Sequence, residues 1–82
     1  MDDAEIVRRI NELADEEHKL ERSHTGGGSG LTVEEQQRLR ELEIALDQCW
    51  DLLRQRRARR EFDQDPDQAR VRDPRTVEGY QQ

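Results

Sequence analysis

Apolar side chains recur at helical spacing near the start of the chain. Steps of four, three and seven residues separate the members of this stripe, which are Ile6, Ile10, Leu13 and Leu20. Alternating steps of three and four place side chains along one face of an α-helix. Glu17 occupies the position at which the next apolar member would fall. The pattern therefore predicts a helix over residues 3–22 with one polar interruption in its apolar face.

A second stripe with similar spacing lies in the middle of the chain. Its members are Leu39, Leu42, Leu46, Cys49 and Leu53. Thr32 and Glu35 have the spacing of a capping box, in which each side chain accepts a hydrogen bond from the other residue's backbone amide. Asp65 precedes Pro66, and the residue before a proline avoids the helical region of backbone angles. The sequence thus predicts a helix over residues 33–62.

The segments between and after these helices are polar and contain helix breakers. Residues 23–31 include a glycine-rich run that cannot sustain a helix, so we expect a loop. Residues 63–82 form a polar tail, which we expect to be loosely docked or flexible. Within it, Asp65 and Pro66 favour one short helical turn that starts at the proline. The tail also has three apolar groups that can pack on the helices: Val71, Val77 and Tyr80.

Two amphipathic helices joined by a short loop pack side by side and antiparallel. An alignment that starts from the loop matches the two stripes level by level and places Ile10 near Leu46. Glu17 then falls near Arg38, which offers its charge a partner. We therefore predict an all-α fold, an antiparallel two-helix hairpin of coiled-coil type over residues 1–62.

The predicted second helix has more apolar surface than one narrow stripe can cover. Ala45, Trp50 and Leu52 flank its stripe, whereas Ile44 lies on the opposite side. Either the tail or a second copy of the chain must cover the remainder. A homodimer of hairpins that forms a four-helix bundle is the simplest closed arrangement, so we expect self-association.

Composition and charge restrict the class of protein. Of the 82 residues, 30% are hydrophobic and 41% are charged, which allows one small domain without a layered core. The net charge is −6, and an acidic protein does not coat nucleic acid with its whole surface. Cys49 is the one cysteine, so no internal disulfide forms. No apolar run reaches the ~20 residues that cross a bilayer. We expect a cytoplasmic protein without membrane association.

One segment concentrates positive charge near the end of the second helix. Five arginines lie within residues 54–60, and they are Arg54, Arg56, Arg57, Arg59 and Arg60. Cations near a helix C-terminus complement its dipole, and the antiparallel alignment brings Arg54, Arg56 and Arg57 near the acidic start of the first helix. We favour this structural interpretation over contact with an acidic protein partner, and rank nucleic acid last. No aromatic residues alternate with the arginines to stack on bases.

The remaining candidates for chemistry are few. Glu21 and His24 have the Glu-x-x-His spacing of di-iron bundles, and Asp15 and His18 have the same spacing with aspartate. His18 lies off the apolar stripe and the second helix has no histidine, so solvated surface histidines are expected. Two other residues are expected to pack rather than react: Cys49 and Trp50. We find no nucleophile elbow, P-loop, dinucleotide fingerprint or zinc-ligand spacing. We therefore expect no enzyme activity, no catalytic residue, no cofactor and no metal.

Three stretches together carry a family resemblance. They are Glu16-Glu17-His18, the run from Leu46 through Cys49-Trp50-Asp51 to Arg59, and Val77-Glu78-Gly79-Tyr80. The chain resembles, over nearly its whole length, a family of short bacterial proteins known as domain of unknown function 2630. The resemblance implies a small, helical, cytoplasmic protein, and it brings no functional residues with it.

These observations leave three hypotheses of different classes. The first is a small non-enzymatic protein–protein interaction module, expected to be homodimeric. The second is a nucleic-acid- or ribosome-associated accessory protein that uses residues 54–60. The third and weakest is a carboxylate–histidine metal-binding bundle formed across a dimer.

Overall fold

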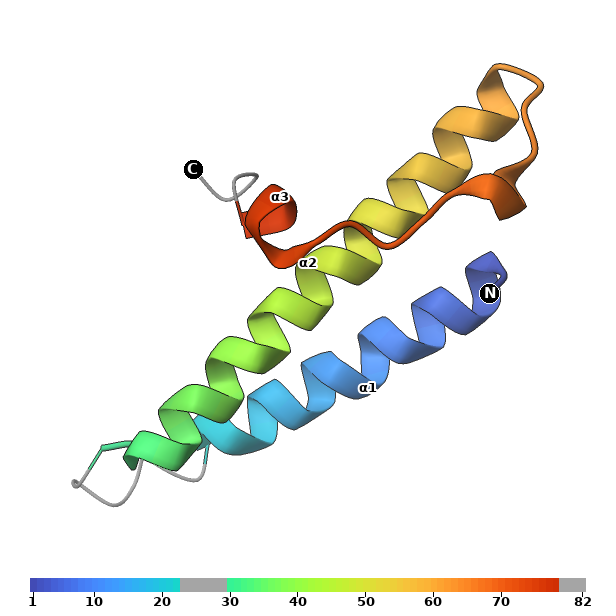
Figure 1. Cartoon of the computed structure of the whole chain (residues 1–82). Coiled ribbons are helices and arrows are strands. Elements are labelled where there is room, and N and C mark those ends of the chain that lie inside the picture. Colours follow the sequence, from blue (N-terminus) through green and yellow to red (C-terminus); the bar gives the residue numbers. More distant parts are fainter. Residues whose placement is uncertain (23–29, 79–82) are drawn as a thin grey trace.

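A computed structural model of the chain describes residues 1–22 and 30–78. It contains helix α1 over Asp3–Arg22, helix α2 over Val33–Glu61, a short 3-10 turn η1 over Pro66–Gln68, and helix α3 over Pro74–Glu78. Helices α1 and α2 run antiparallel as a long hairpin, and the tail returns along α2 (Figure 1). The predicted all-α hairpin is therefore confirmed.

Each long helix starts at a side-chain cap. In α1, the Asp2 carboxylate accepts a hydrogen bond from the amide of Glu5 at 2.8 Å. In α2, the Thr32 hydroxyl accepts from the Glu35 amide at 3.1 Å, and the Glu35 carboxylate accepts from the Thr32 amide at 3.0 Å. The capping box is thus present as predicted. These contacts satisfy amides that have no partner within the helix.

Helix α2 ends at a backbone motif rather than at the proline. Asp63 has a φ of +54°, in the left-handed region. The Gln64 amide donates to the Arg59 carbonyl at 2.6 Å, and the Asp63 amide donates to the Arg60 carbonyl at 3.3 Å. This pair of bonds is a Schellman motif. The helix therefore stops at Glu61, before Pro66 has any influence.

The apolar stripes of the two helices form the core. Ile6, Leu42 and Leu53 are almost completely buried. Ile6 and Leu53 belong to a cluster against which Leu46 and Cys49 also pack. The register follows from one ion pair near the loop, in which Arg38 Nη2 lies 2.8 Å from Glu16 Oε2. This core matches the stripes that the periodicity predicts.

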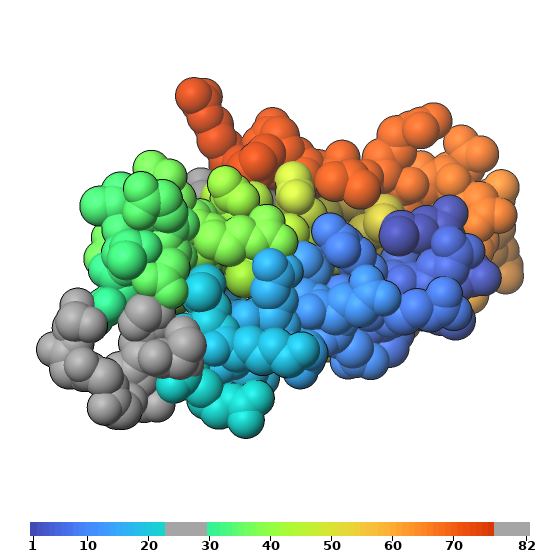
Figure 2. Space-filling model, turned by 90° about the horizontal axis from the view of Figure 1, so that it is seen from below, coloured from blue at the N-terminus to red at the C-terminus, as the bar shows by residue number. Residues whose placement is uncertain are grey.

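The tail docks along α2, and over part of its length atoms of α2 are visible between the tail and α1 (Figure 2). Gln55 Nε2 donates to the Arg70 carbonyl at 2.6 Å, and Gln48 Nε2 donates to the Arg72 carbonyl at 3.1 Å. Ala69 packs against the core cluster that contains Leu52. The predicted turn is present as η1, with Asp65 as its cap.

The tail thus covers part of the apolar surface left over by the hairpin. Leu52 is buried, with 7% of its surface exposed, although it flanks the stripe. Ile44, on the far side from the stripe, is also half-buried. It lies on the same helical face as Gln48 and Gln55, which contact the tail, and α3 packs on α2. The predictions for the glycine run, His24, Tyr80 and the side chain of Val77 fall outside the part of the chain that the structure describes.

Candidate interaction site

Arg56 joins three segments of the chain at the open end of the hairpin. Its Nε donates to Asp3 Oδ1 of α1 at 2.5 Å, and its Nη1 donates to Asp67 Oδ1 of the tail at 2.9 Å. The same Nη1 donates to the Pro66 carbonyl at 3.2 Å. Only 8% of the Arg56 side chain is exposed. A seam position of α2 thus ends the core with a buried guanidinium that contacts both α1 and the tail.

Asp3 receives two arginines at once. Besides Arg56, Nη2 of Arg60 donates to Asp3 Oδ2 at 2.5 Å. The hydrogen bond from Arg60, and then that from Arg56, lower the pKa of Asp3 from 3.8 to about 2. The pKa values of both arginines are raised, since hydrogen bonds to Asp3 favour their charged forms.

The structure corrects which arginines meet the start of α1. The alignment predicts Arg54, Arg56 and Arg57 there, whereas the ion pairs to Asp3 come from Arg56 and Arg60. Arg56 and Arg60 are one helical turn apart on the side of α2 that faces α1. Arg57 is exposed, one position around the helix. The predicted run therefore divides into a clamp of Arg56 and Arg60 and three arginines outside it.

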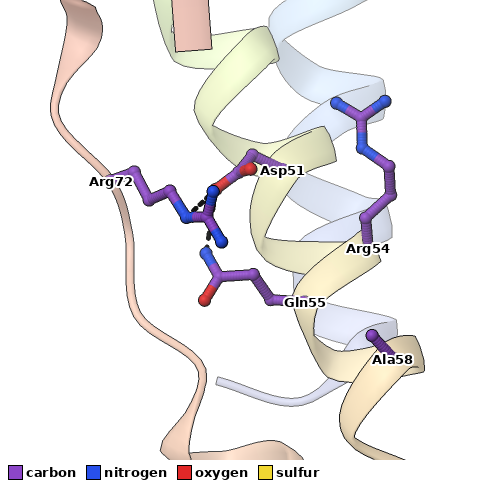
Figure 3. Close-up of a pocket in the computed structure, with 5 residues that line it drawn as sticks. All are labelled: Asp51, Arg54, Gln55, Ala58 and Arg72. Carbon is purple, nitrogen blue, oxygen red and sulfur yellow. Dashed lines mark hydrogen bonds and ion pairs between the residues drawn. The ribbon is translucent and has the colours of Figure 1, made fainter. Parts of the chain in front are cut away.

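A shallow hollow lies between α2 and the tail (Figure 3). Its lining is Asp51, Arg54, Gln55, Ala58 and Arg72. Asp51 is 3% exposed, and its Oδ2 accepts from Gln55 Nε2 at 2.8 Å and lies 3.5 Å from Arg72 Nε. The carboxylate is thus occupied by the tail's own arginine, so the hollow is part of the tail's attachment.

Helical geometry separates two flanks of the hairpin. Arg9 lines a groove with Leu52 and Val71, which places Arg9 and Leu52 on the flank that the tail covers. Two residues turn a helix by about 200°, so Val7 and Trp50 lie on the opposite flank. We call this side of the hairpin the open face.

The open face exposes large apolar groups. Trp50 is 47% exposed and Val7 is 43% exposed. Positions seven and three residues before Trp50, and four and seven after it, also fall on this side of α2. They are Glu43, Asp47, Arg54 and Arg57, and of these Arg54 also borders the hollow between α2 and the tail. The open face therefore has an apolar centre with acidic residues toward the loop and basic residues toward the open end.

Carboxylates cluster near Glu17 at the loop end. Burial raises the pKa of the Glu17 carboxyl above its usual range. Three nearby carboxylates raise this pKa further, those of Glu21, Glu43 and Asp47. The predicted partner of Glu17 is wrong: Arg38 binds the neighbouring Glu16 through two hydrogen bonds of 2.9 and 2.8 Å.

Other candidate residues have ordinary surroundings in the described part of the chain. Cys49 is half-buried, and burial raises the pKa of its thiol, which disfavours the reactive thiolate. His18 is exposed. Over residues 1–22 and 30–78, no three side chains of the metal-binding types converge on one point. None of the described helices has the length and apolar character that crossing a membrane requires.

Several polar residues that organise this site escape prediction from sequence. Asp51 and Gln55 sit inside the charged stretch of α2 and hold the tail, and Asp67 completes the clamp on Arg56. One signal was available: Gln48, Asp51 and Gln55 are spaced by three and four, which places three polar groups on one helical face.

Comparison with known proteins gives matches to sequences alone. A family described as a protein of unknown function (DUF2630) matches residues 2–82. An uncharacterized protein of Mycobacterium bovis is 51% identical over 78 residues, which cover 95% of this chain and 88% of the relative. Uncharacterized proteins from two strains of Mycobacterium tuberculosis match to the same extent. No solved structure matches the chain at a significant level.

Proposed function

This chain belongs to the DUF2630 family, and we propose that it is a small non-enzymatic protein–protein interaction module that works as a homodimer. The observation that carries the proposal is the open face, where Trp50 and Val7 remain about half exposed after the tail has covered the other flank. Tryptophan is enriched among the residues that dominate binding energy at protein interfaces.

The elongated shape of the molecule supports an interface along its length. The chain extends 52 × 24 × 17 Å, and each partner of a standard interface buries ~800 Å². Two hairpins that meet through the open face place four long helices together, as in a four-helix bundle.

The ionisable groups support a non-enzymatic role. In the described residues the buried charged side chains, Asp51 and Arg56, hold segments of the same chain together. A catalytic acid or base instead needs reach to a substrate proton. We place the protein in the cytoplasm, where a single half-buried thiol such as Cys49 remains reduced.

Sedimentation equilibrium tests the self-association directly. We expect a dimer at micromolar concentration and a melting temperature that rises with protein concentration. Trp50→Ser should shift the protein toward monomer. Phe62→Ser, which removes another exposed aromatic ring beyond the end of α2, is the matched control and should leave the dimer intact. A wild-type monomer with concentration-independent melting would reject the proposal.

The second candidate is a nucleic-acid- or ribosome-associated protein, for which Arg54, Arg57 and Arg59 lie outside the clamp on Asp3. Replacing these three with Gln, while the clamp stays intact, separates binding from folding. If this candidate is correct, the wild type binds labelled RNA with a steep salt dependence that the variant loses. An acidic protein partner would use the same arginines, and its binding would persist in the presence of excess RNA.

A further inference from the structure

We propose that two copies of the chain pack through their open faces, with their α2 helices antiparallel and crossing at Trp50. In this arrangement Arg54 of one copy lies against Asp47 of the partner subunit, and Arg57 lies against Glu43 of the partner subunit. The inference rests on the proposed self-association and adds its geometry and the source of its specificity.

The spacing of charges along α2 carries the inference. Relative to Trp50, acidic residues lie at positions −7 and −3, and basic residues lie at +4 and +7. A two-fold axis through Trp50 reverses the direction of the second helix, so each arginine meets a carboxylate at almost the same distance from the centre. A parallel arrangement would place like charges opposite each other, which destabilises an interface. The open face is therefore complementary to itself in one orientation.

The apolar centre fits the same geometry. Trp50 lies on the two-fold axis and meets its own copy there, and Val7 borders it on α1. Exposed aromatic rings that become buried at the centre of an interface, within a polar rim, form the usual pattern of a binding hot spot. On the tail flank, Ala69 and the backbone at Arg70 already occupy part of the α2 surface.

The surroundings of Glu17 give a further reason for a basic partner. Burial and neighbouring carboxylates both act against the ionised form of Glu17, which shows that negative charge accumulates at this end of the open face. Incoming arginines from a second copy would relieve that repulsion. Glu43 and Asp47 take part in it, so both carboxylates lie near Glu17 at the loop end of the hairpin.

Charge reversal on one side of the face gives a sharp test. The first variant carries Arg54→Glu and Arg57→Glu, and the second carries Glu43→Lys and Asp47→Lys. Each variant alone places like charges opposite each other, so we expect its dimer dissociation constant to rise at least tenfold at low salt. Mixed in equal amounts, the two variants should form a heterodimer, and the quadruple variant should regain the homodimer. All of these effects should shrink as salt rises.

The control and the readouts keep the geometry separate from the self-association. Arg59→Glu with Arg70→Glu makes the same change in charge away from the open face and should dimerise like the wild type. Circular dichroism checks that each variant is folded, and the chain's one tryptophan reports burial of Trp50 by a blue shift of its emission. If both one-sided variants dimerise as tightly as the wild type, the antiparallel geometry is wrong while the homodimer stands. If the wild type is monomeric, both proposals fail.

Discussion

At the scale of single residues, the protein relies on a few charged groups in unlike surroundings. Two arginines lower the pKa of Asp3. In contrast, partial burial and neighbouring carboxylates raise the pKa of Glu17. The two carboxyl groups therefore shift the pH dependence of stability in opposite directions. The sequence alone does not separate them, because both are acidic residues of the same amphipathic helix.

Asp3 should make the protein sensitive to acid. Its pKa is about 2 in the folded chain against an ordinary 3.8, so its contribution is present above about pH 4 and is lost as the pH falls through 2. Asp3→Asn should lower stability at pH 7 by about 1 kcal/mol, because solvent screens the partly exposed pair. Urea melts at pH 7, 4 and 2.5 measure this, with Asp15→Asn as the control for an exposed carboxylate on α1. A variant that loses stability as steeply as the wild type below pH 4 contradicts the assignment.

Glu17 should respond in the opposite sense. The pKa of Glu17 is higher in the folded chain than in the unfolded chain. Its contribution to stability therefore falls as the pH rises from the unfolded pKa to the folded pKa. Glu17→Leu should stabilise the protein by about 1–2 kcal/mol, since it restores an apolar seam position and removes a partly desolvated charge. Glu17→Gln, which removes the charge alone, should give a smaller gain. Thermal melts at pH 7 measure the stability of both variants. A loss of stability in Glu17→Leu would mean that the apolar seam does not pass through this position.

At the scale of the helices, periodicity determines most of what the structure shows. Helix α1 covers Asp3–Arg22 and α2 covers Val33–Glu61, close to the ranges that the apolar spacing and the capping box predict. What periodicity could not predict is the termination of α2, because the backbone motif at Asp63 uses a residue other than glycine. It also could not predict which flank the tail covers, since that choice depends on side-chain amides that bind backbone carbonyls far along the chain.

Truncations along α2 test the packing of this helix. Leu42→Ala should cost about 2–5 kcal/mol, since Leu42 is 1% exposed in the seam. Ile44→Ala should cost about 1 kcal/mol, because Ile44 is only half-buried on the side followed by the tail. Denaturant melts of both variants measure the difference. Equal losses would show that α2 is rotated relative to the register described above.

At the scale of the whole molecule, the tail is an integral layer that covers one flank of α2. The sequence predicted a polar tail that is loosely docked or flexible, and in the structure residues 63–76 lie along α2 with contacts at Gln48, Gln55 and Arg56. A polar composition hides this docking, because the contacts are hydrogen bonds and ion pairs rather than apolar burial. The same layer explains why one flank is covered and the open face remains available.

Weaker docking of the tail should speed hydrogen exchange at one backbone amide, that of Arg70. The Arg70 amide donates to Gln55 Oε1 at 3.2 Å, and Gln55 is held by Asp51. Asp51→Asn removes the charge that attracts Arg72, so the Arg70 amide should exchange with solvent hydrogen several-fold faster, while amides in the middle of α2 keep their protection. Hydrogen exchange followed by NMR measures both. Unchanged exchange at Arg70 would show that the ion pair to Arg72 contributes little to docking.

The guanidinium of Arg56 couples the docking of α1 to the docking of the tail. Asp3 and Asp67 come from opposite ends of the sequence and bind the same side chain. Whichever of them binds first restricts the rotamers of Arg56, so the second binds a side chain whose conformational entropy is already lost. Docking of α1 and docking of the tail are therefore thermodynamically linked, and by reciprocity each strengthens the other equally. Fraying of either end should spread to the other, so that both ends open as one unit.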